Sequence, residues 1–380
     1  MRKTINIGDL GTIITGKTPP TTNKNYYGDY AVFIKPTDIS EQSKYTYETE
    51  EMYSKLAAEK YESSLIPKGA ICVPCIGTIG TKMTMTPCDC YTNQSINSII
   101  CNENYDNEYV YYLIKNFLPG LKAYNLGTAS GREYVSKSNF EKIELVAEQD
   151  KEIQKKIGVI LSRYDSLIEN YQKQIKLLEE AAQRLYKEWF IDLHFPGHEN
   201  TNIIDGVPEG WEKKKVGDIT PIITGKKDAN FGTPDGEYPF FTCSQEPIKA
   251  PSFSFDCAAV LLAGNGDFNV KLYRGRFEAY QRTYVLSPYI DSHLYLLFYT
   301  ISANMTKLAA GSSGSTIKFL TKGMIDGINL NVPNDEILRS FNKKVEPIQS
   351  SRESLQSQLR LLTEARDRLL PKLMSGEITI

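Results

Sequence analysis

The sequence has little of what marks a membrane-bound or secreted protein. It contains no apolar run long enough to cross a bilayer, and its first residues, MRKTINIGDL, lack the apolar core of a signal peptide. Its 7 cysteines are an odd number spread over 380 residues, which favours a reducing compartment over a disulfide framework. We therefore expect a cytoplasmic protein with no membrane partner.

An excess of charge of one sign is also lacking. The chain carries 44 Lys and Arg against 46 Asp and Glu, a net charge of −2. Bulk charge therefore gives no indication of nucleic acid, and a basic surface would have to be local. The length, with 41% hydrophobic residues, is enough for two or three domains with cores of their own.

The chain does contain an internal repeat. GDLGTIITGK at 8–17 matches GDITPIITGK at 217–226, and QKQIKLLEEAAQRL at 172–185 matches QSQLRLLTEARDRL at 356–369. Each repeat has a front part of variable length and a better-matched, helical end. This pattern predicts pseudo-twofold symmetry within one polypeptide.

The ends of the repeats predict two long helices. Apolar residues recur every three or four positions from Ile153 to Trp189, with one extra residue near Ile175, which is typical of a heptad seam with a stutter. In the second helix Asn334 suits the N-cap. Pro347 is expected to break or kink that helix early, and Pro371 is expected to mark its end.

These elements predict an α+β fold with two mixed α/β globular domains and two long antiparallel coiled-coil helices. The expected domains are 1–147 and 211–332, the first helix is 148–192, the linker is 193–210, and the second helix with a C-terminal tail is 333–380. The second helix starts at the second domain, so it must run back along the first helix to pair with it.

Adjacent apolar pairs widen the stripe on each helix beyond one narrow seam, which predicts surface for partner helices. The expected partner-interface residues are Leu167, Ile168, Leu177, Leu178, Trp189, Phe190, Leu361, Leu362, Leu369 and Leu370.

Residues 11–18, GTIITGKT, match the phosphate-binding loop of nucleotide hydrolases letter for letter. The second copy of the repeat lacks the first glycine, and Lys227 stands in the place of Thr18. Ile13 and Ile14 favour a strand, and two prolines after Thr18 disfavour the helix that a phosphate loop needs. We therefore interpret Gly8–Lys17 as a strand and a turn.

Catalytic motifs are not evident. KTPPT at 17–21 lacks the Asn or Asp and the aromatic residue of the adenine methyltransferase loop. Pro196 and Gly197 between His194 and His198 argue against a helix that would place both histidines on one face. Neither catalytic residues nor a metal site are predicted on these grounds.

Four cysteines offer a zinc site as an alternative. Cys72 and Cys75, followed by Cys88 and Cys90, have spacing that could complete a tetrahedral set. The simpler interpretation is that Cys72 and Cys75 lie on a half-buried strand as small apolar residues. The second repeat has nothing equivalent.

What remains is a binding protein whose basic and amide side chains suit DNA phosphates and base edges. The segment KLYRGRFEAYQRTY at 271–284 interleaves basic and aromatic residues, and Gly275 suits a hairpin tip; a solvated hairpin with scattered charges fits equally well. Gln94 and Gln281 correspond in the two repeats. The candidate DNA-binding residues are Lys17, Thr18, Lys35, Thr37, Gln94, Arg132, Lys226, Lys227, Asn265, Lys271, Arg274, Arg276, Gln281, Arg282 and Lys318.

The order of several strings resembles the specificity subunits of type I restriction–modification systems. The strings are IKPTDI at 34–39, TNQSI at 92–96, WFIDLHFPG at 189–197, VPEGW at 207–211, GSTIKFLTKGMIDGINLNVP at 314–333 and LLPKLMSGEI at 369–378. The resemblance implies that each globular domain is a target recognition domain for one half of a split site on double-stranded DNA. It implies that the helices set the gap and dock methyltransferase subunits, two in number, with restriction and translocase subunits as further partners.

The resemblance also implies that this chain is not an enzyme and holds no cofactor. S-adenosylmethionine, ATP and Mg would be bound by the partner subunits. Because most loops differ between the repeats, an asymmetric split target is expected. Two alternatives remain at this stage: a coiled-coil scaffold with protein-binding heads, and, with less support, an ATPase that uses residues 11–18.

Overall fold

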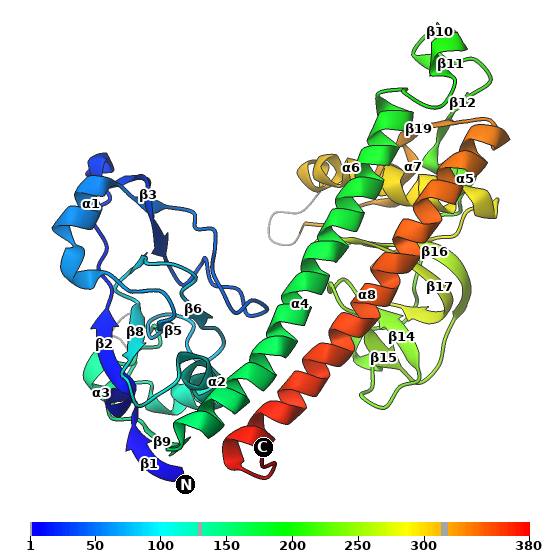
Figure 1. Cartoon of the computed structure of the whole chain (residues 1–380). Helices are drawn as coiled ribbons and strands as arrows, with labels where there is room; N and C mark the ends of the chain where they lie inside the picture. Colours follow the sequence, from blue (N-terminus) through cyan, green and yellow to red (C-terminus); the bar gives the residue numbers. More distant parts are fainter. Residues whose placement is uncertain (1, 128–130, 313–317) are drawn as a thin grey trace. The chain divides into compact units, whose positions relative to one another are not determined.

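The chain forms two compact units. The structure is a computed structural model, and it describes residues 2–127, 131–312 and 318–380. Unit 1 comprises Met1–Lys173 and Leu355–Ile380, and unit 2 comprises Gln174–Ser354. Two long helices, α4 (Lys151–Tyr186) and α8 (Asp335–Ser375), each contribute one part to unit 1 and the other part to unit 2 (Figure 1). The five-segment division expected from the sequence stays a prediction.

Unit 1 combines short helices with three small sheets, ordered β1-β9, β2-β8-β5-β6 and β4-β3-β7. The strands β3 and β7 are parallel, and the other neighbours are antiparallel. The strands are β1 (Arg2–Asn6), β2 (Gly11–Thr15), β3 (Tyr27–Ile34), β4 (Met52–Tyr53), β5 (Ile71–Pro74), β6 (Thr84–Met85), β7 (Tyr91–Thr92), β8 (Ile96–Cys101) and β9 (Glu144–Glu148). The α-helices are α1 (Lys55–Lys60), α2 (Asn107–Phe117) and α3 (Lys137–Glu141), and the 3-10 turns are η1 (Ile7–Leu10), η2 (Lys24–Tyr26), η3 (Glu62–Ser64) and η4 (Leu118–Tyr124).

Unit 2 has the sheets β10-β11, β12-β19 and the six-stranded β13-β18-β16-β17-β14-β15. The strands are β10 (Ile203–Ile204), β11 (Val207–Pro208), β12 (Glu212–Lys215), β13 (Ile223–Thr224), β14 (Tyr238–Phe241), β15 (Ile248–Ala250), β16 (Phe255–Ala263), β17 (Val270–Ala279), β18 (Thr283–Leu286) and β19 (Asn329–Val332). The helices are α5 (Val216–Ile219), α6 (Leu294–Gly311) and α7 (Lys322–Asp326), with a π-helical turn η5 (Lys187–Ile191) and 3-10 turns η6 (His198–Asn200), η7 (Ala229–Phe231) and η8 (Asp291–His293).

The two units share one topology, as the internal repeat predicts. The order β13-β18-β16-β17 in unit 2 corresponds to β2-β8-β5-β6 in unit 1, and β12-β19 corresponds to β1-β9. The strand β14 runs parallel to the end of β17, as β3 runs parallel to β7. The long strand β17 thus replaces β6 and β7 together, which accounts for the better continuity of the sheet in unit 2.

In each unit the parts of α4 and α8 pack antiparallel. In unit 1 Ile157 and Leu161, from the first half of α4, share a buried core with Leu370 and Leu373, from the last half of α8. In unit 2 the reverse holds, since Trp189, just beyond α4, packs on Phe341 near the start of α8 with ring centroids 5.9 Å apart. The predicted antiparallel pairing is therefore confirmed in each unit separately.

The prediction that Pro347 breaks α8 and that Pro371 ends it is wrong. The helix is continuous from Asp335 to Ser375, and Asn334 caps its start, because its side-chain oxygen accepts the Ile337 amide at 3.0 Å. Both prolines lie on the exposed side of the helix, where the carbonyl left without a donor can face water. Val345, two residues before Pro347, is buried in the core of unit 2, and Leu373, two residues after Pro371, is buried in the core of unit 1. These contacts hold the helix in place next to each proline.

A buried ionic network links α2, α4 and α8 in unit 1. Asp165 accepts from Arg366 at 2.6 Å and from the Tyr112 hydroxyl at 2.6 Å, and the Asp165 and Arg366 side chains are only 5% and 10% exposed. Burial opposes the charge on Arg366, but the pairing with Asp165 prevails and raises the pKa of the guanidinium. In unit 2 the matching contact is neutral, with Gln349 donating to the Tyr299 hydroxyl.

Among the residues that the structure describes, none of the helices is both long and apolar enough to cross a bilayer.

We expect Arg366→Ala to lower the free energy of unfolding by about 3 kcal/mol, because it removes the close cation of the buried Asp165 carboxylate and leaves only Lys115, 4.0 Å away. Urea unfolding monitored by circular dichroism measures the change. Arg368→Ala, at an exposed position of the same helix, is the matched control and should change stability by less than about 0.5 kcal/mol. Equal losses in the two variants would show that the network does not stabilise unit 1.

Candidate nucleic-acid interface

The first element of the candidate site in unit 1 is the turn after β2. The amides of Gly16 and Lys17 donate to the carbonyls of Ile96, at 3.2 Å, and Thr92, at 2.9 Å. A Cβ atom on Gly16 would lie 2.1 Å from the Thr92 carbonyl oxygen, so only glycine permits this approach. The turn therefore presents the exposed Lys17 and the partly exposed Thr18 beside residues 92–96.

Unit 2 repeats this turn after β13. The Gly225 amide donates to the Thr283 carbonyl at 3.1 Å, and a Cβ on Gly225 would lie 1.9 Å from the Ala279 carbonyl oxygen. The Gln281 amide donates to the Lys227 carbonyl at 2.9 Å. The repeated Thr-Gly-Lys string thus has the same structural role in both units, which is a close approach of two chain segments.

The second element is a tight turn that carries a glutamine in each unit. In unit 1 the Ile96 amide donates to the Asn93 carbonyl at 3.1 Å, which places Gln94 and Ser95 at the tip. In unit 2 the Thr283 amide donates to the Tyr280 carbonyl at 2.8 Å, with Gln281 and Arg282 at the tip. The predicted correspondence of Gln94 and Gln281 is therefore confirmed at the level of the backbone.

A third segment joins each glutamine turn. The Cys75 amide donates to the Ser95 carbonyl at 2.7 Å, and the Gly264 amide donates to the Arg282 carbonyl at 2.8 Å. The next residue in each unit forms an isolated antiparallel bridge, Ile76 with Tyr134 and Asn265 with Phe319. These bridges bring in the chain that precedes α3 and α7, with the exposed Arg132 and Lys318.

We call these sets the unit 1 loop cluster (residues 16–18, 75–77, 93–96 and 132–134) and the unit 2 loop cluster (residues 225–228, 264–266, 280–283 and 318–320). Residues 128–130 and 313–317, which belong to the small polar loops GTASGR and GSSGST, lie outside the described residues. Within the clusters the exposed candidates are Lys17, Gln94, Arg132, Lys226, Gln281, Arg282 and Lys318.

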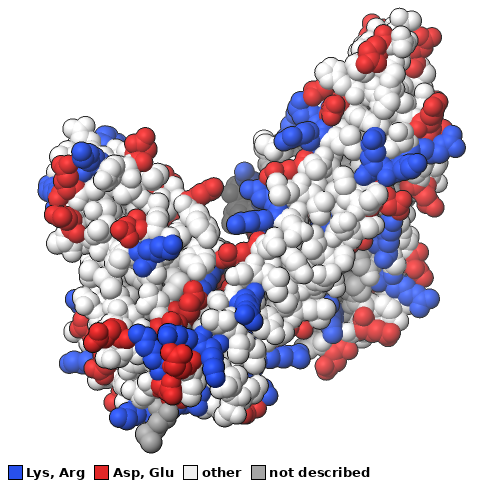
Figure 2. Space-filling view, in the orientation of Figure 1, with Lys and Arg blue, Asp and Glu red and all other residues white. Residues whose placement is uncertain are grey.

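The wider surface does not add a large basic area. On the face drawn in Figure 2, Lys and Arg alternate with Asp and Glu and with uncharged residues, in keeping with the net charge of −2. Local loops, rather than a whole basic face, are therefore the places where an anionic backbone could be contacted.

Several candidate cations are engaged within the chain instead. Lys35 pairs with Glu50 at 2.8 Å and with Glu51 at 3.2 Å, next to the exposed Thr37. Lys271 donates to the Ser244 carbonyl at 2.7 Å, and burial lowers the pKa of its ammonium group. Lys227 lies over the Phe231 ring at 4.2 Å, while Asn265 is half-buried.

The hairpin expected around Gly275 is not present, because Gly275 lies in the middle of the ten-residue strand β17, opposite Cys257. Its φ of +120° is a backbone conformation that glycine adopts readily. The glycine therefore lets the strand continue through this position without a turn. Arg274 donates to the Tyr295 hydroxyl at 2.7 Å, and Arg276 pairs with Asp256 at 3.1 Å. Both guanidinium groups therefore contact the chain itself.

The match to a phosphate-binding loop has no structural support. Gly11–Thr15 is strand, residues 16–20 are described and form no helix, and the Gly16 and Lys17 amides are already bonded to carbonyls. A phosphate loop requires those amides to be free. The interpretation of this segment as a strand and a turn is confirmed for Gly11–Lys17, while residues 7–10 form the 3-10 turn η1.

The four cysteines do not assemble a zinc site in the described part of the chain, where groups of three or more His, Cys, Asp or Glu suited to a metal are not found. Cys72, in β5, and Cys75, just after it, belong to two different apolar clusters. Burial raises the pKa of each of these thiols to about 12, so both remain protonated and apolar. His194 lies in a loop and His198 begins the 3-10 turn η6, with the two ring centroids 5.2 Å apart.

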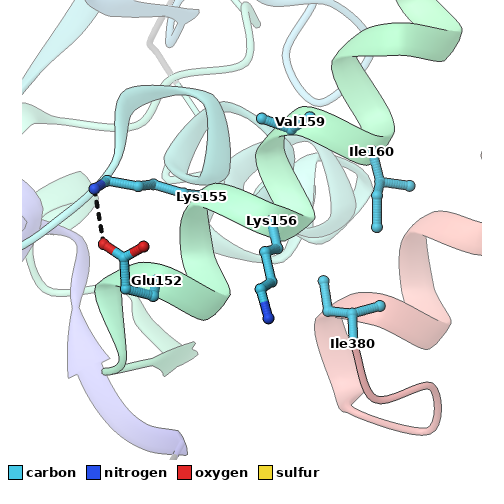
Figure 3. A pocket seen from close by; sticks show the side chains of 6 residues that line it. All are labelled: Glu152, Lys155, Lys156, Val159, Ile160 and Ile380. Carbon is cyan, nitrogen blue, oxygen red and sulfur yellow. Dashed lines mark hydrogen bonds and ion pairs between the residues drawn. The ribbon is translucent and has the colours of Figure 1, made fainter.

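A shallow cavity of about 270 Å³ lies in unit 1 beside the start of α4 (Figure 3). Its lining is apolar at Val159, Ile160 and Ile380, and the charged residue Glu152 is paired with Lys155 at 2.8 Å. A nucleophile activated by a neighbouring base is not present in this lining, so the cavity offers an apolar contact surface and not a reaction site.

The candidate partner-interface residues divide by exposure. Ile168, Trp189, Phe190 and Leu370 are buried in the chain's own cores. Leu178, Leu362 and Leu369 are half-buried. Leu167, Leu177 and Leu361 are 43%, 63% and 56% exposed, so these three have surface to offer a partner.

Sequence reasoning missed Ser95, which shares the tip of the unit 1 turn with Gln94. Its counterpart Arg282 was a candidate because arginine is a familiar DNA-contacting residue. Alignment of TNQSI with AYQRT on the shared glutamine would have paired the two positions.

Comparison with known proteins agrees with this architecture. Residues 2–180 and 208–351 match the family model of the Type I restriction modification DNA specificity domain. The Type I restriction enzyme EcoDI specificity subunit of Escherichia coli is 36% identical over 177 residues, covering 46% of this chain and 40% of that protein. The MjaIX specificity subunit of Methanocaldococcus jannaschii is 26% identical over 98% of this chain and 93% of its own length.

A solved structure, the S subunit of a type I restriction–modification system from M. genitalium, has the same fold, with a TM-score of 0.67 and 16% identity over 98% of this chain and 96% of that one. The repeated topology, the two loop clusters and the family match over both repeats lead to one conclusion. The chain belongs to the type I restriction–modification DNA specificity family and is a specificity subunit of such a system.

Proposed function

We propose that this chain recognises a bipartite, asymmetric DNA target and docks adenine methyltransferase subunits, and that it performs no chemistry itself. The observation that carries the proposal is the pair of loop clusters, which have the same backbone arrangement and different side chains. Two copies of one backbone arrangement that carry different side chains at their loop tips suit the recognition of two different DNA sequences.

The side chains at equivalent positions differ in their chemistry for base edges. The turn in unit 1 presents Gln94 and Ser95, and the turn in unit 2 presents Gln281 and Arg282. Glutamine pairs well with adenine, and arginine with guanine, in the major groove. The exposed Lys17 and Lys226 after the two glycines suit phosphates, which position a protein without reading sequence. Because of these differences, the two halves of the DNA target are expected to differ in sequence.

Docking of two methyltransferase subunits is supported by a repeated feature of the long helices. Leu177 and Leu361 occupy the same position in the repeated strings QKQIKLLEE and QSQLRLLTE. Each is exposed, one in unit 2 and the other in unit 1, although a leucine gains most from burial. Equivalent apolar positions on two related helices suit two copies of one partner.

The chemistry belongs to the partners in this proposal. The methyltransferase subunits would bind S-adenosylmethionine, and added restriction subunits would use ATP and Mg. The chain would act in the cytoplasm, where its DNA substrate and these subunits meet. The helices α4 and α8 would fix the gap between the two halves of the target.

We expect Lys17→Ala and Lys226→Ala each to weaken DNA binding by the complex of this chain with its methyltransferase subunits. Each lost phosphate contact should reduce the slope of log affinity against log salt by about 0.9. Titration of a labelled duplex by fluorescence anisotropy at several salt concentrations measures both quantities.

The matched control is Lys35→Ala, because Lys35 is already paired with Glu50 and Glu51. It should leave the slope unchanged. The DNA-recognition proposal is wrong if the wild-type complex binds no DNA, and the loop clusters are not the interface if all three variants keep the wild-type slope.

We expect Leu177→Glu and Leu361→Glu each to remove one methyltransferase copy from the complex, because a carboxylate cannot be buried at an apolar contact without a partner. The double variant should lose both copies. Mass photometry of the co-expressed complex at nanomolar concentration counts the copies.

Leu177→Met and Leu361→Met keep the apolar contact and should retain two copies. Since both leucines are exposed, none of these substitutions should lower the unfolding temperature. Two bound copies in the double Glu variant would place docking elsewhere on the chain.

A further inference from the structure

The turn that presents Gln94 is held by the backbone on both sides. The Asn93 amide donates to the Ile34 carbonyl at 3.1 Å, which ties the turn to the end of β3. The Asn93 side-chain oxygen accepts the Ser95 amide at 3.1 Å, and the Asn93 carbonyl accepts the Ile96 amide. The Cα atom of Gln94 therefore has a fixed place, although its side chain is exposed.

The side chain of Gln94 is oriented as well, because the Thr18 hydroxyl donates a hydrogen bond to its Oε1 atom. The segment that carries Thr18 is itself anchored by two tyrosines. Tyr53 donates to the Lys17 carbonyl at 2.6 Å, and Tyr27 donates to the Pro19 carbonyl at 2.8 Å. Tyr53 is fully buried and packs on Tyr91 with ring centroids 4.5 Å apart, so the anchor belongs to the core.

An oriented amide discriminates between purines. Adenine presents an N6 donor and an N7 acceptor in the major groove, which match the oxygen and the nitrogen of a glutamine amide. Guanine presents two acceptors, O6 and N7. A free amide can rotate to direct its NH₂ group at both, but an amide whose oxygen is held by a hydroxyl would set that oxygen against a guanine acceptor. The carbonyl oxygen keeps a second lone pair for the adenine N6 donor.

Unit 2 lacks this arrangement in the described residues. Lys227 replaces Thr18 in the repeat and lies over the Phe231 ring, and the side chain of Gln281 has no hydrogen-bond partner among those residues. The two turns share their backbone hydrogen bond, so the contact that orients the glutamine amide in unit 1 alone is the one from the Thr18 hydroxyl.

We propose that Gln94 reads an adenine in one half of the DNA target and that Thr18 is the positioning residue that fixes its amide against guanine. The proposal rests on the proposed function, since it names the base that one loop cluster reads. Gln281, without such a hydroxyl, discriminates less between adenine and guanine at the corresponding place in the other half.

The test uses the full chain assembled with its methyltransferase subunits and a duplex library with randomised positions. Bound DNA is sequenced for the wild type and for Thr18→Val, Thr18→Ser and Gln94→Ala. The wild type should enrich a motif that contains an adenine preferred over guanine by roughly tenfold or more. Thr18→Val keeps the shape and removes the hydroxyl, so the preference at that one position should fall at least about threefold. Thr18→Ser should keep it.

Gln94→Ala should abolish the preference at the same position and leave the other half of the motif unchanged. This second variant keeps the test decisive if Thr18→Val assembles poorly. The assignment is overturned if both Thr18→Val and Gln94→Ala enrich the wild-type motif at every position. A wild-type complex that enriches no motif contradicts the proposed function itself, which is a different outcome.

Discussion

The antiparallel packing of α4 against α8 is the constraint on which the rest of the structure depends. Unit 1 is formed by two separate stretches of chain, because it needs the end of α8. Unit 2 is one continuous stretch, and it needs the end of α4 and the start of α8. Leu370 and Leu373 complete the core of unit 1, and Trp189 and Phe190 complete that of unit 2. A subunit built in this way cannot lose either helix without exposing apolar surface in both units.

The chemistry of the helix pair differs between the units in a way that the repeat conceals. Unit 1 buries the Asp165–Arg366 pair, and the cost of desolvating it is offset by the pairing itself, by the Tyr112 hydroxyl and by Lys115, 4.0 Å from Asp165. Unit 2 uses the uncharged Gln349 and Tyr299 at the matching place. A buried ionic contact tolerates misplacement poorly, so we expect the register of the helix pair to be more strictly defined in unit 1 than in unit 2.

The duplication, the long helices and their antiparallel pairing could be predicted from the sequence. Repeated strings and the spacing of apolar residues can be recognised without knowing which distant residues are in contact. It failed at Pro347, Pro371 and Gly275, where local propensity was outweighed by packing of the neighbouring residues. It also treated Lys35 and Arg274 as free cations, because the glutamates and the tyrosine that engage them lie far along the chain or on another element. The Thr-Gly-Lys string was correctly separated from a phosphate loop by the residues that follow it.

The most direct measurement is hydroxyl-radical footprinting of the chain, assembled with the methyltransferase subunits proposed for it, on a duplex that this complex binds. If each loop cluster contacts one half of a split target, two protected segments should flank an unprotected gap of fixed length. Lys17→Ala should weaken one protected segment and Lys226→Ala the other. A single protected segment, or loss of protection in both halves from either substitution, would contradict the claim that each loop cluster binds one half of the target.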